Sequence, residues 1–127
     1  MYEMLGVLQD YQNHCRNVFE PKLDQWAPGG AITRKERNQS GALTRVPFST
    51  GSTLDILRHD QDIKVFEGSD YDFCHFDEPP PKKIFNAVWR GLTDRGGMAY
   101  ITATPLIEPW LYQLYQQALA GDELVWV

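Results

Sequence analysis

Two adjacent carboxylates, Asp77 and Glu78, are the residues of this 127-residue chain whose types and position best suit chemistry. They follow the mostly apolar run 71–76 and precede three consecutive prolines at 79–81. Since proline has no N–H to donate to a sheet, the pattern predicts a buried strand that ends at the acidic pair. Ligands of open α/β sheets bind beyond the carboxyl ends of the strands. One acid there can serve a Mg²⁺ ion on nucleotide phosphates, and a second can orient the attacking water.

A hydrophobic strand followed by Asp and Glu is the Walker B pattern of P-loop ATPases. The same pair also occurs in ordinary solvated turns, so the pair alone leaves both interpretations open. A phosphate-binding loop needs glycines followed by Lys and Ser/Thr at the start of a helix. In the closest stretch, 29–36, Arg34 stands in place of the second glycine and Glu36 in place of the hydroxyl. No Gly-Lys-Ser/Thr occurs elsewhere, so the 127 residues contain no Walker A element.

A second polar group follows the next predicted strand. Residues 98–102 are β-prone and lead into Thr102-Ala103-Thr104-Pro105, and a helix predicted from Pro81 to Gly91 or Gly96-Gly97 separates them from the acidic pair. Strand, helix and strand in this order predict a parallel βαβ unit, whose two strands end on the same rim of the sheet. We therefore expect Asp77, Glu78 and Thr104 to face one ligand. The alternative for Thr104 is a helix-capping or turn hydroxyl.

The remaining patterns predict the elements that position this rim. Residues 2–19 carry apolar residues every three or four positions, which predicts an amphipathic helix. The other predicted elements are a short helix around Leu23 and Trp26 after Pro21, a polar loop at 33–41 that is the most basic segment, a hairpin at 46–57 around Ser49-Thr50-Gly51-Ser52, a strand at 63–66, a helix from Pro109 to Gly121 with Leu111, Leu114, Tyr115 and Ala118 on its apolar face, and a strand at 124–127.

Composition limits the function classes. An apolar content of 43% supports one packed domain, and a net charge of −5 argues against a basic nucleic-acid surface over the whole chain, although not against a local one. Cys15 and Cys74 are expected to be free thiols. His14, His59 and His75 lack metal-ligand spacing, which favours structural or surface roles. No secretory or transmembrane segment is present, so we expect a soluble intracellular protein.

Several stretches, in this order and spacing, resemble the ATPase domain of tailed-phage terminase large subunits, the motors that thread viral DNA into a preformed capsid shell. The resemblance spans residues 23–127, and it is carried by Gly51-Ser52 in the predicted hairpin, Phe66-Glu67-Gly68, Phe73-Cys74-His75-Phe76-Asp77-Glu78-Pro79-Pro80, Arg90-Gly91-Leu92, and Thr102-Ala103-Thr104-Pro105-Leu106 with Trp110 following. The combination is specific, although each piece alone is weak.

The resemblance implies roles for particular residues. Asp77 would serve Mg²⁺ and Glu78 would activate water for attack on the γ-phosphate of ATP. Thr102-Ala103-Thr104 would be the coupling motif, which senses the γ-phosphate and passes hydrolysis on to the DNA-gripping parts. Arg90 is a candidate for stabilising charge on the phosphates, with an ordinary helix arginine as the alternative.

The implied fold is α/β, a partial P-loop NTPase of the ASCE type, with a parallel sheet flanked by helices and an inserted β-hairpin. Residues 1–127 would form a partial ATPase domain without the Walker A element and the nuclease domain. The implied partners are double-stranded DNA, the portal, the small terminase subunit and further copies in a ring, in the host cytoplasm. The isolated chain would bind ATP poorly and leave apolar sheet edges open. A non-catalytic prophage remnant or interaction module, and a helicase-like ATPase fragment, are the alternatives.

Overall fold

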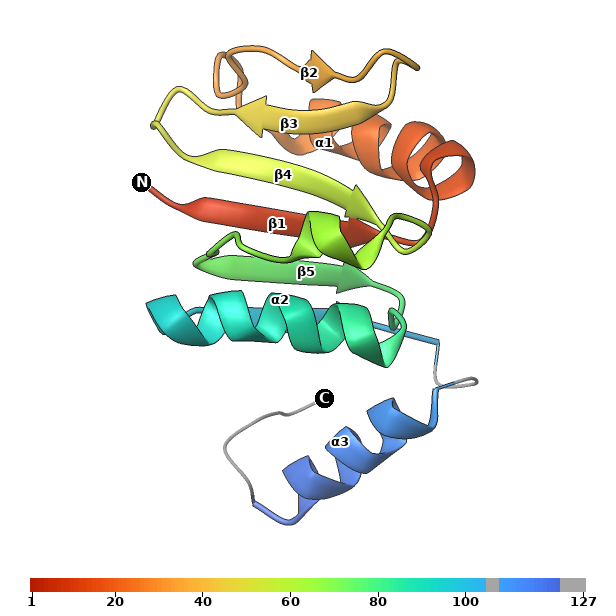
Figure 1. Ribbon diagram of the computed structural model, residues 1–127. Helices are drawn as coiled ribbons and strands as arrows, with labels where there is room; N and C mark the ends of the chain where they lie inside the picture. The colour runs from red at the N-terminus through yellow and green to blue at the C-terminus, as the bar shows by residue number, and fades with distance from the viewer. Residues whose placement is uncertain (105–107, 122–127) are drawn as a thin grey trace.

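The computed structural model of the chain describes residues 1–104 and 108–121 (Figure 1). Six strands and several helical segments make up an α/β fold. In chain order these are β1 (Glu3–Leu8), the π-helix η1 (Tyr11–Phe19), α1 (Glu20–Trp26), β2 (Glu36–Arg37), β3 (Leu43–Pro47), β4 (Thr53–Arg58), the 3-10 helix η2 (Ile63–Phe66), β5 (Phe73–Asp77), α2 (Lys82–Arg95), β6 (Met98–Thr102) and α3 (Pro109–Leu119).

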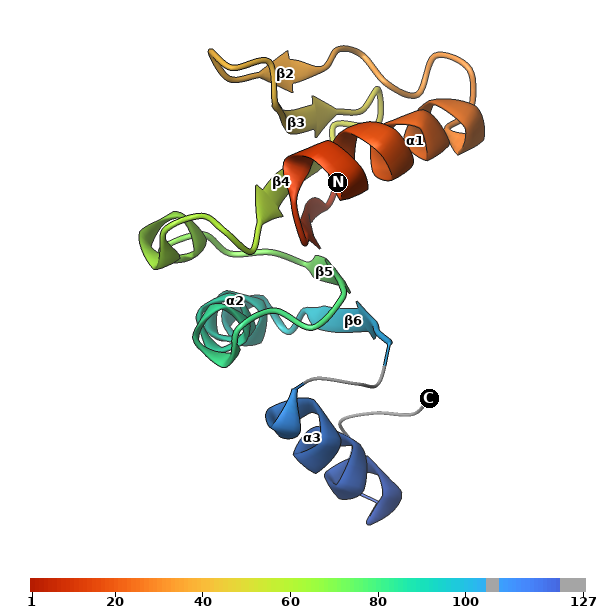
Figure 2. The ribbon, with the colours of Figure 1, turned by 90° about the vertical axis from the view of Figure 1, so that its right-hand side faces the viewer.

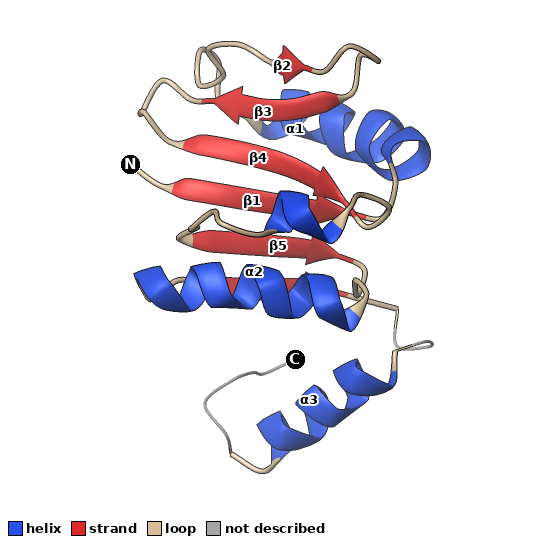
Figure 3. Cartoon of the chain, viewed as in Figure 1, coloured by secondary structure: helices blue, strands red, loops and turns tan. Residues whose placement is uncertain are grey.

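The strands form one mixed sheet in the order β2-β3-β4-β1-β5-β6. Figures 1 and 3 show β2 to β5 in this order, and β6, which α2 covers in these views, is labelled in Figure 2. The strands β4, β1, β5 and β6 are parallel, whereas β3 is antiparallel to β4 and β2 is antiparallel to β3. The predicted β5–α2–β6 unit and the β3–β4 hairpin are confirmed. The parallel sheet expected from the sequence is present as the larger part of a mixed sheet.

The helix predicted over residues 2–19 is wrong in its first half. Residues Glu3–Leu8 form β1, which lies in the centre of the sheet between β4 and β5, and the helix starts only at Tyr11. The run Met4-Leu5-Gly6-Val7-Leu8 is apolar at every position, as expected of a parallel strand that is covered on both faces. Met4 and Leu8 also fit a helical spacing, and for this reason the pattern predicts a helix. Asp10 caps the new helix through a hydrogen bond from the Asn13 N–H to its side chain, at 2.7 Å.

Two apolar clusters hold the helices on opposite faces of the sheet. Figure 2 shows η1 and α1 on one side and α2 on the other. The α2 cluster joins buried residues of β1, β5 and α2, namely Leu5, Val7, Cys74, Phe76, Ile84, Ala87, Val88 and Leu92, with Phe66 and Tyr71. The cluster under η1 joins Leu8, Cys15, Leu43, Val46 and Ile56. Both cysteines are free, as expected, and the structure shows that both are buried.

Three further expectations meet a different structure. Residues Ile63–Phe66, predicted as a strand, form η2, because the Asp62 side chain accepts the Lys64 N–H and starts a helical turn. The predicted polar loop contains the two-residue strand β2. On α3, Tyr115 lies 40% exposed although it was placed on the apolar face, and Trp110 is the buried residue of that helix. The strand predicted at 124–127 lies outside the described residues.

The two edges of the sheet differ in character. The edge strand β2 is short and charged, which discourages pairing with other chains. The edge strand β6 has five residues without charge and exposes Met98 and Tyr100. None of the described helices combines the length and the apolar character needed to cross a membrane.

Candidate active site

Four of the predicted site residues, Asp77, Glu78, Thr102 and Thr104, come together where β5 and β6 end. Asp77, the last residue of β5, is paired in register with Thr102, the last residue of β6. The N–H of Glu78 donates to the Thr102 carbonyl at 2.8 Å, which extends the sheet ladder by one bond beyond Asp77. Because the strands are parallel, both carboxylates and both threonines lie on the same rim of the sheet.

Glu78 is bound directly to Thr104. The Thr104 N–H donates to Glu78 Oε2 at 3.1 Å, and the Thr104 hydroxyl donates to Glu78 Oε1 at 3.2 Å. Glu78 has a φ of 68°, and it is the one non-glycine residue with a positive φ in the described part of the chain. The left-handed region costs a residue with a Cβ about 1–2 kcal/mol, and such strain is often found at functional sites. The turn thus directs this carboxylate at the segment that follows β6.

Asp77 is linked to a histidine through Thr102. Oγ1 of Thr102 lies 3.4 Å from Asp77 Oδ1 and 2.9 Å from His75 Nε2. His75 and Asp77 stand two residues apart on β5 and therefore share a face of the sheet. Cys74 and Phe76 alternate with them and point into the α2 cluster. The site accordingly includes His75, for which the sequence spacing favours a structural or surface role.

Burial and the acidic rim act in opposite directions on two histidines. Burial lowers the pKa of His75, and the charge of Asp77 opposes this effect. Burial likewise lowers the pKa of His59, with Asp77 among the charges that oppose it. Nε2 of His59 is buried and has no hydrogen-bond partner within the described structure. Both rings therefore favour the neutral form more than an exposed histidine does.

Arg90 is not brought to this rim. It lies on α2, eight residues after the first residue of the helix, which is a distance of about 12 Å along the axis. Its side chain is exposed, and Nε donates to the Asn86 carbonyl of the same helix at 3.4 Å. This geometry is that of an ordinary helix arginine, the alternative interpretation of the residue.

The rim offers oxygen ligands, which suit a hard cation such as Mg²⁺. Across residues 1–104 and 108–121, no group of three or more His, Cys, Asp and Glu side chains is arranged to hold a metal ion. Mg²⁺ does not require such a group, because it keeps several waters and binds proteins through one or two carboxylates together with substrate phosphates. Asp77 fits this mode of binding.

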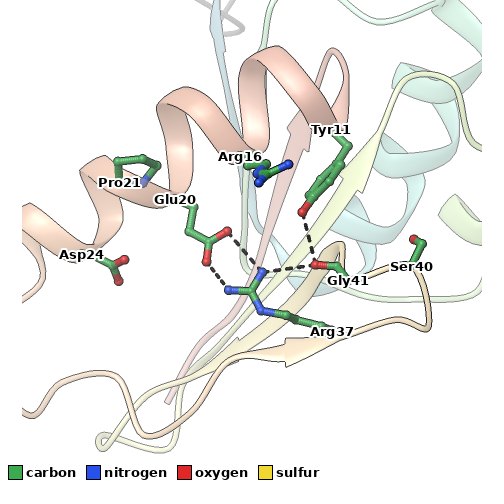
Figure 4. A pocket seen from close by; sticks show the side chains of 8 residues that line it. All are labelled: Tyr11, Arg16, Glu20, Pro21, Asp24, Arg37, Ser40 and Gly41. Carbon is green, nitrogen blue, oxygen red and sulfur yellow. Dashed lines mark hydrogen bonds and ion pairs between the residues drawn. The ribbon is translucent and has the colours of Figure 1, made fainter.

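The most basic segment of the chain is neutralised by ion pairs. Arg37 pairs with Glu20, which also lies 3.2 Å from Lys35 Nζ, and Lys35 is 2.7 Å from Asp24. The hydrogen bond from Arg37 lowers the pKa of Glu20, and burial opposes the shift. A groove of about 630 Å³ runs beside these residues, where Tyr11 and Arg37 both donate to the Gly41 carbonyl (Figure 4). The charges of the segment are thus engaged within the protein.

A second groove of about 310 Å³ lies near Arg45, Asp55 and Tyr71. Asp77, Glu78, Thr102 and Thr104 line neither groove. Asp77, Glu78 and Thr102 are partly buried and Thr104 is exposed, so the rim is accessible to solvent. The sequence matches no known protein-family model and no curated protein.

Proposed function

We propose that the chain is part of the ATPase motor of a viral DNA-packaging terminase large subunit, with ATP hydrolysis at the β5–β6 rim coupled to DNA translocation. The observation that carries the proposal is the pair of hydrogen bonds between Glu78 and Thr104. It joins the residue expected to activate water to the residue expected to couple hydrolysis to movement. The P-loop NTPase assignment of the fold, ATP and Mg²⁺, and the partners DNA, portal, small subunit and ring copies belong to the same proposal.

In this proposal the rim residues divide the work of phosphoryl transfer. Asp77 would hold Mg²⁺, which neutralises charge on the phosphates when it is bound. Glu78 orients the attacking water and accepts its proton with carboxylate lone pairs that Thr104 leaves free, and the protonated carboxyl group then accepts more weakly from Thr104. A change in the partners of Glu78 therefore changes the hydrogen bonds of Thr104. This supports a role for the segment after β6 in passing hydrolysis on to other parts of the motor.

The proposal can be tested on ATP turnover once a phosphate-binding segment is supplied. The chain would be fused downstream of a segment carrying Gly-Lys-Ser/Thr, and turnover would be measured against Mg²⁺ concentration. Asp77→Asn should raise the Mg²⁺ concentration required, because a carboxylate ligand becomes a neutral amide. The matched control is Asp62→Asn, which changes an aspartate at the start of η2. Identical Mg²⁺ profiles for wild type and Asp77→Asn would refute the role of Asp77.

A second candidate function is a non-catalytic interaction module that keeps the sheet without the chemistry. It is favoured by the Glu78 carboxylate, each of whose oxygens accepts a hydrogen bond from Thr104 within the protein. A well-folded fusion with no ATP turnover under any Mg²⁺ concentration would support this function over the first.

A further inference from the structure

We propose that His75 is a positioning residue of this site, which fixes the hydroxyl of Thr102 and, through that hydroxyl, the carboxylate of Asp77. The hydrogen bonds do not depend on the proposed function, whereas their consequence for a metal at Asp77 rests on it. The geometry brings three polar side chains of two adjacent strands into one chain of contacts, at 2.9 Å and 3.4 Å.

The imidazole of His75 packs against an aromatic ring of the neighbouring strand β6. The ring of Tyr100 on β6 lies 5.3 Å from the His75 ring, tilted by 47°. On the other side, the register partner of His75 on β1 is Gly6, which has no side chain. The ring is thus packed by β6, the same strand that carries Thr102, and its Nε2 is kept next to the threonine hydroxyl.

Because the hydroxyl of Thr102 has a single proton, the tautomer of His75 decides whether that hydroxyl can donate to Asp77. When Nε2 carries the ring proton, it donates to Thr102 Oγ1, and the hydroxyl proton is left for Asp77 Oδ1 or for the Phe76 carbonyl at 3.5 Å. When Nδ1 carries the ring proton, the hydroxyl donates to Nε2 and Asp77 receives nothing. The negative charge of Asp77 favours the first arrangement, since both donor dipoles then point toward the carboxylate.

In the favoured arrangement His75 acts on Asp77 as an outer-shell residue acts on a metal ligand. A hydrogen bond to one carboxylate oxygen sets the orientation of the group and leaves the other oxygen for a cation. The sequence position supports this role, because strand alternation puts His75 and Asp77 on one face, and the strand register pairs Thr102 with Asp77, two positions beyond the pair of His75 and Tyr100.

The tautomer is read directly from the ¹⁵N spectrum of the full chain at pH 7.5, where two-bond couplings from the ring protons identify the protonated nitrogen. We expect His75 protonated at Nε2, and ring signals that shift in Thr102→Val, which removes the hydroxyl at nearly constant shape. A ring protonated at Nδ1, or ring signals unmoved by Thr102→Val, would overturn the proposal. The wild-type measurement needs no variant and decides the matter even if Thr102→Val does not fold.

The consequence for Asp77 is read with Mn²⁺ as the probe, from the broadening of amide signals near Asp77. His75→Phe keeps a ring but removes the donor, and it should weaken Mn²⁺ binding about tenfold, as loss of an outer-shell partner does. His75→Gln supplies an N–H donor and should return the affinity toward that of the wild type. The matched control is His14→Phe, because His14 is bonded to Asp10 instead.

The outcomes separate the two proposals. Equal Mn²⁺ affinity of wild type and His75→Phe, or equal loss in His75→Phe and His75→Gln, contradicts positioning by a hydrogen bond. An Nε2-protonated ring together with no Mn²⁺ binding to wild type supports the chain of hydrogen bonds and shows that Asp77 does not hold the cation without substrate phosphates.

Discussion

The left-handed backbone at Glu78 determines whether glycine or alanine is the more stable replacement at this position. We consider two variants, Glu78→Gly and Glu78→Ala. Both lose the carboxylate and its two hydrogen bonds to Thr104. They differ in the Cβ alone, so a comparison between them isolates the cost of placing a Cβ at a φ of 68°.

Two opposing terms set the expected difference. Glycine escapes the left-handed penalty of about 1–2 kcal/mol, whereas alanine gains about 0.4–1 kcal/mol because it restricts the unfolded chain. The difference leaves Glu78→Gly more stable than Glu78→Ala by roughly 0.5–1 kcal/mol. At an ordinary position the order is the reverse.

Glu67 provides that ordinary position. It is exposed, and its φ of −94° and ψ of 149° are extended. Here Glu67→Ala should be the more stable of the matched pair, by about 0.4–1 kcal/mol. Urea unfolding of the four variants, with slopes of about 1–3 kcal/mol per molar, resolves these differences as midpoint shifts of a few tenths molar.

The reversal of sign between the two positions is the test. If Glu78→Ala proved equal to or more stable than Glu78→Gly, the turn would not be left-handed at this residue. A left-handed turn would then not be what directs the Glu78 carboxylate at Thr104.

Three further predictions concern stability. Gly91→Ala should destabilise the chain by about 1–3 kcal/mol despite the better helix propensity of alanine, because the new Cβ would lie 2.3 Å from the Ser69 carbonyl oxygen; an unchanged thermal midpoint would contradict this packing. Burial lowers the pKa of His59 in the folded state, so near and below the ordinary pKa of 6.5 the unfolded state binds more protons than the folded state. As the pH falls from 7.5 to 5.5, the urea midpoint of the wild type should therefore fall more steeply than that of His59→Gln. Parallel curves for the two proteins would contradict this prediction. The hydrogen bond from Arg37 lowers the pKa of Glu20, so the wild type should exceed Glu20→Gln in unfolding free energy by about 1–2 kcal/mol at pH 7. This advantage is present above the ordinary pKa of 4.5 and is lost as the pH falls through the lowered pKa of the folded state. Equal stability of the two proteins at pH 7 would argue against the ion-pair network.

The elements with strong local sequence signals could be predicted from the sequence. The apolar run before Asp77 and the three prolines after it bound β5, and the left-handed Gly96, with a φ of 65°, ends α2 as expected of a glycine after a helix. The order strand, helix, strand then predicted that β5 and β6 are parallel neighbours, whose carboxyl ends lie on one rim of the sheet. The contacts of Asp77 with Thr102 and of Glu78 with Thr104 lie on this shared rim.

The features that the sequence did not predict correctly are those that local patterns do not determine. Glu3–Leu8 fits a helical spacing as well as a buried strand, and the neighbours β4 and β5, which are distant in sequence, select the strand. The role of His75 depends on strand register, since its contact with Thr102 spans 27 residues. Alternation along β5 was the available signal, because it places His75 on the face of Asp77. Two-residue alternation cannot supply the identity of the facing residue on β6.

The most direct measurement is ATP turnover and nucleotide affinity of Glu78→Gln, in the fusion that supplies a phosphate-binding segment. A carboxylate that activates water contributes about 10²–10⁴-fold to a reaction, so turnover should fall by that factor while nucleotide affinity stays close to that of the wild type. Glu67→Gln, a matched change at an exposed glutamate, should leave both quantities unchanged. Wild-type turnover in Glu78→Gln would contradict the assignment of the β5–β6 rim as a site of ATP hydrolysis.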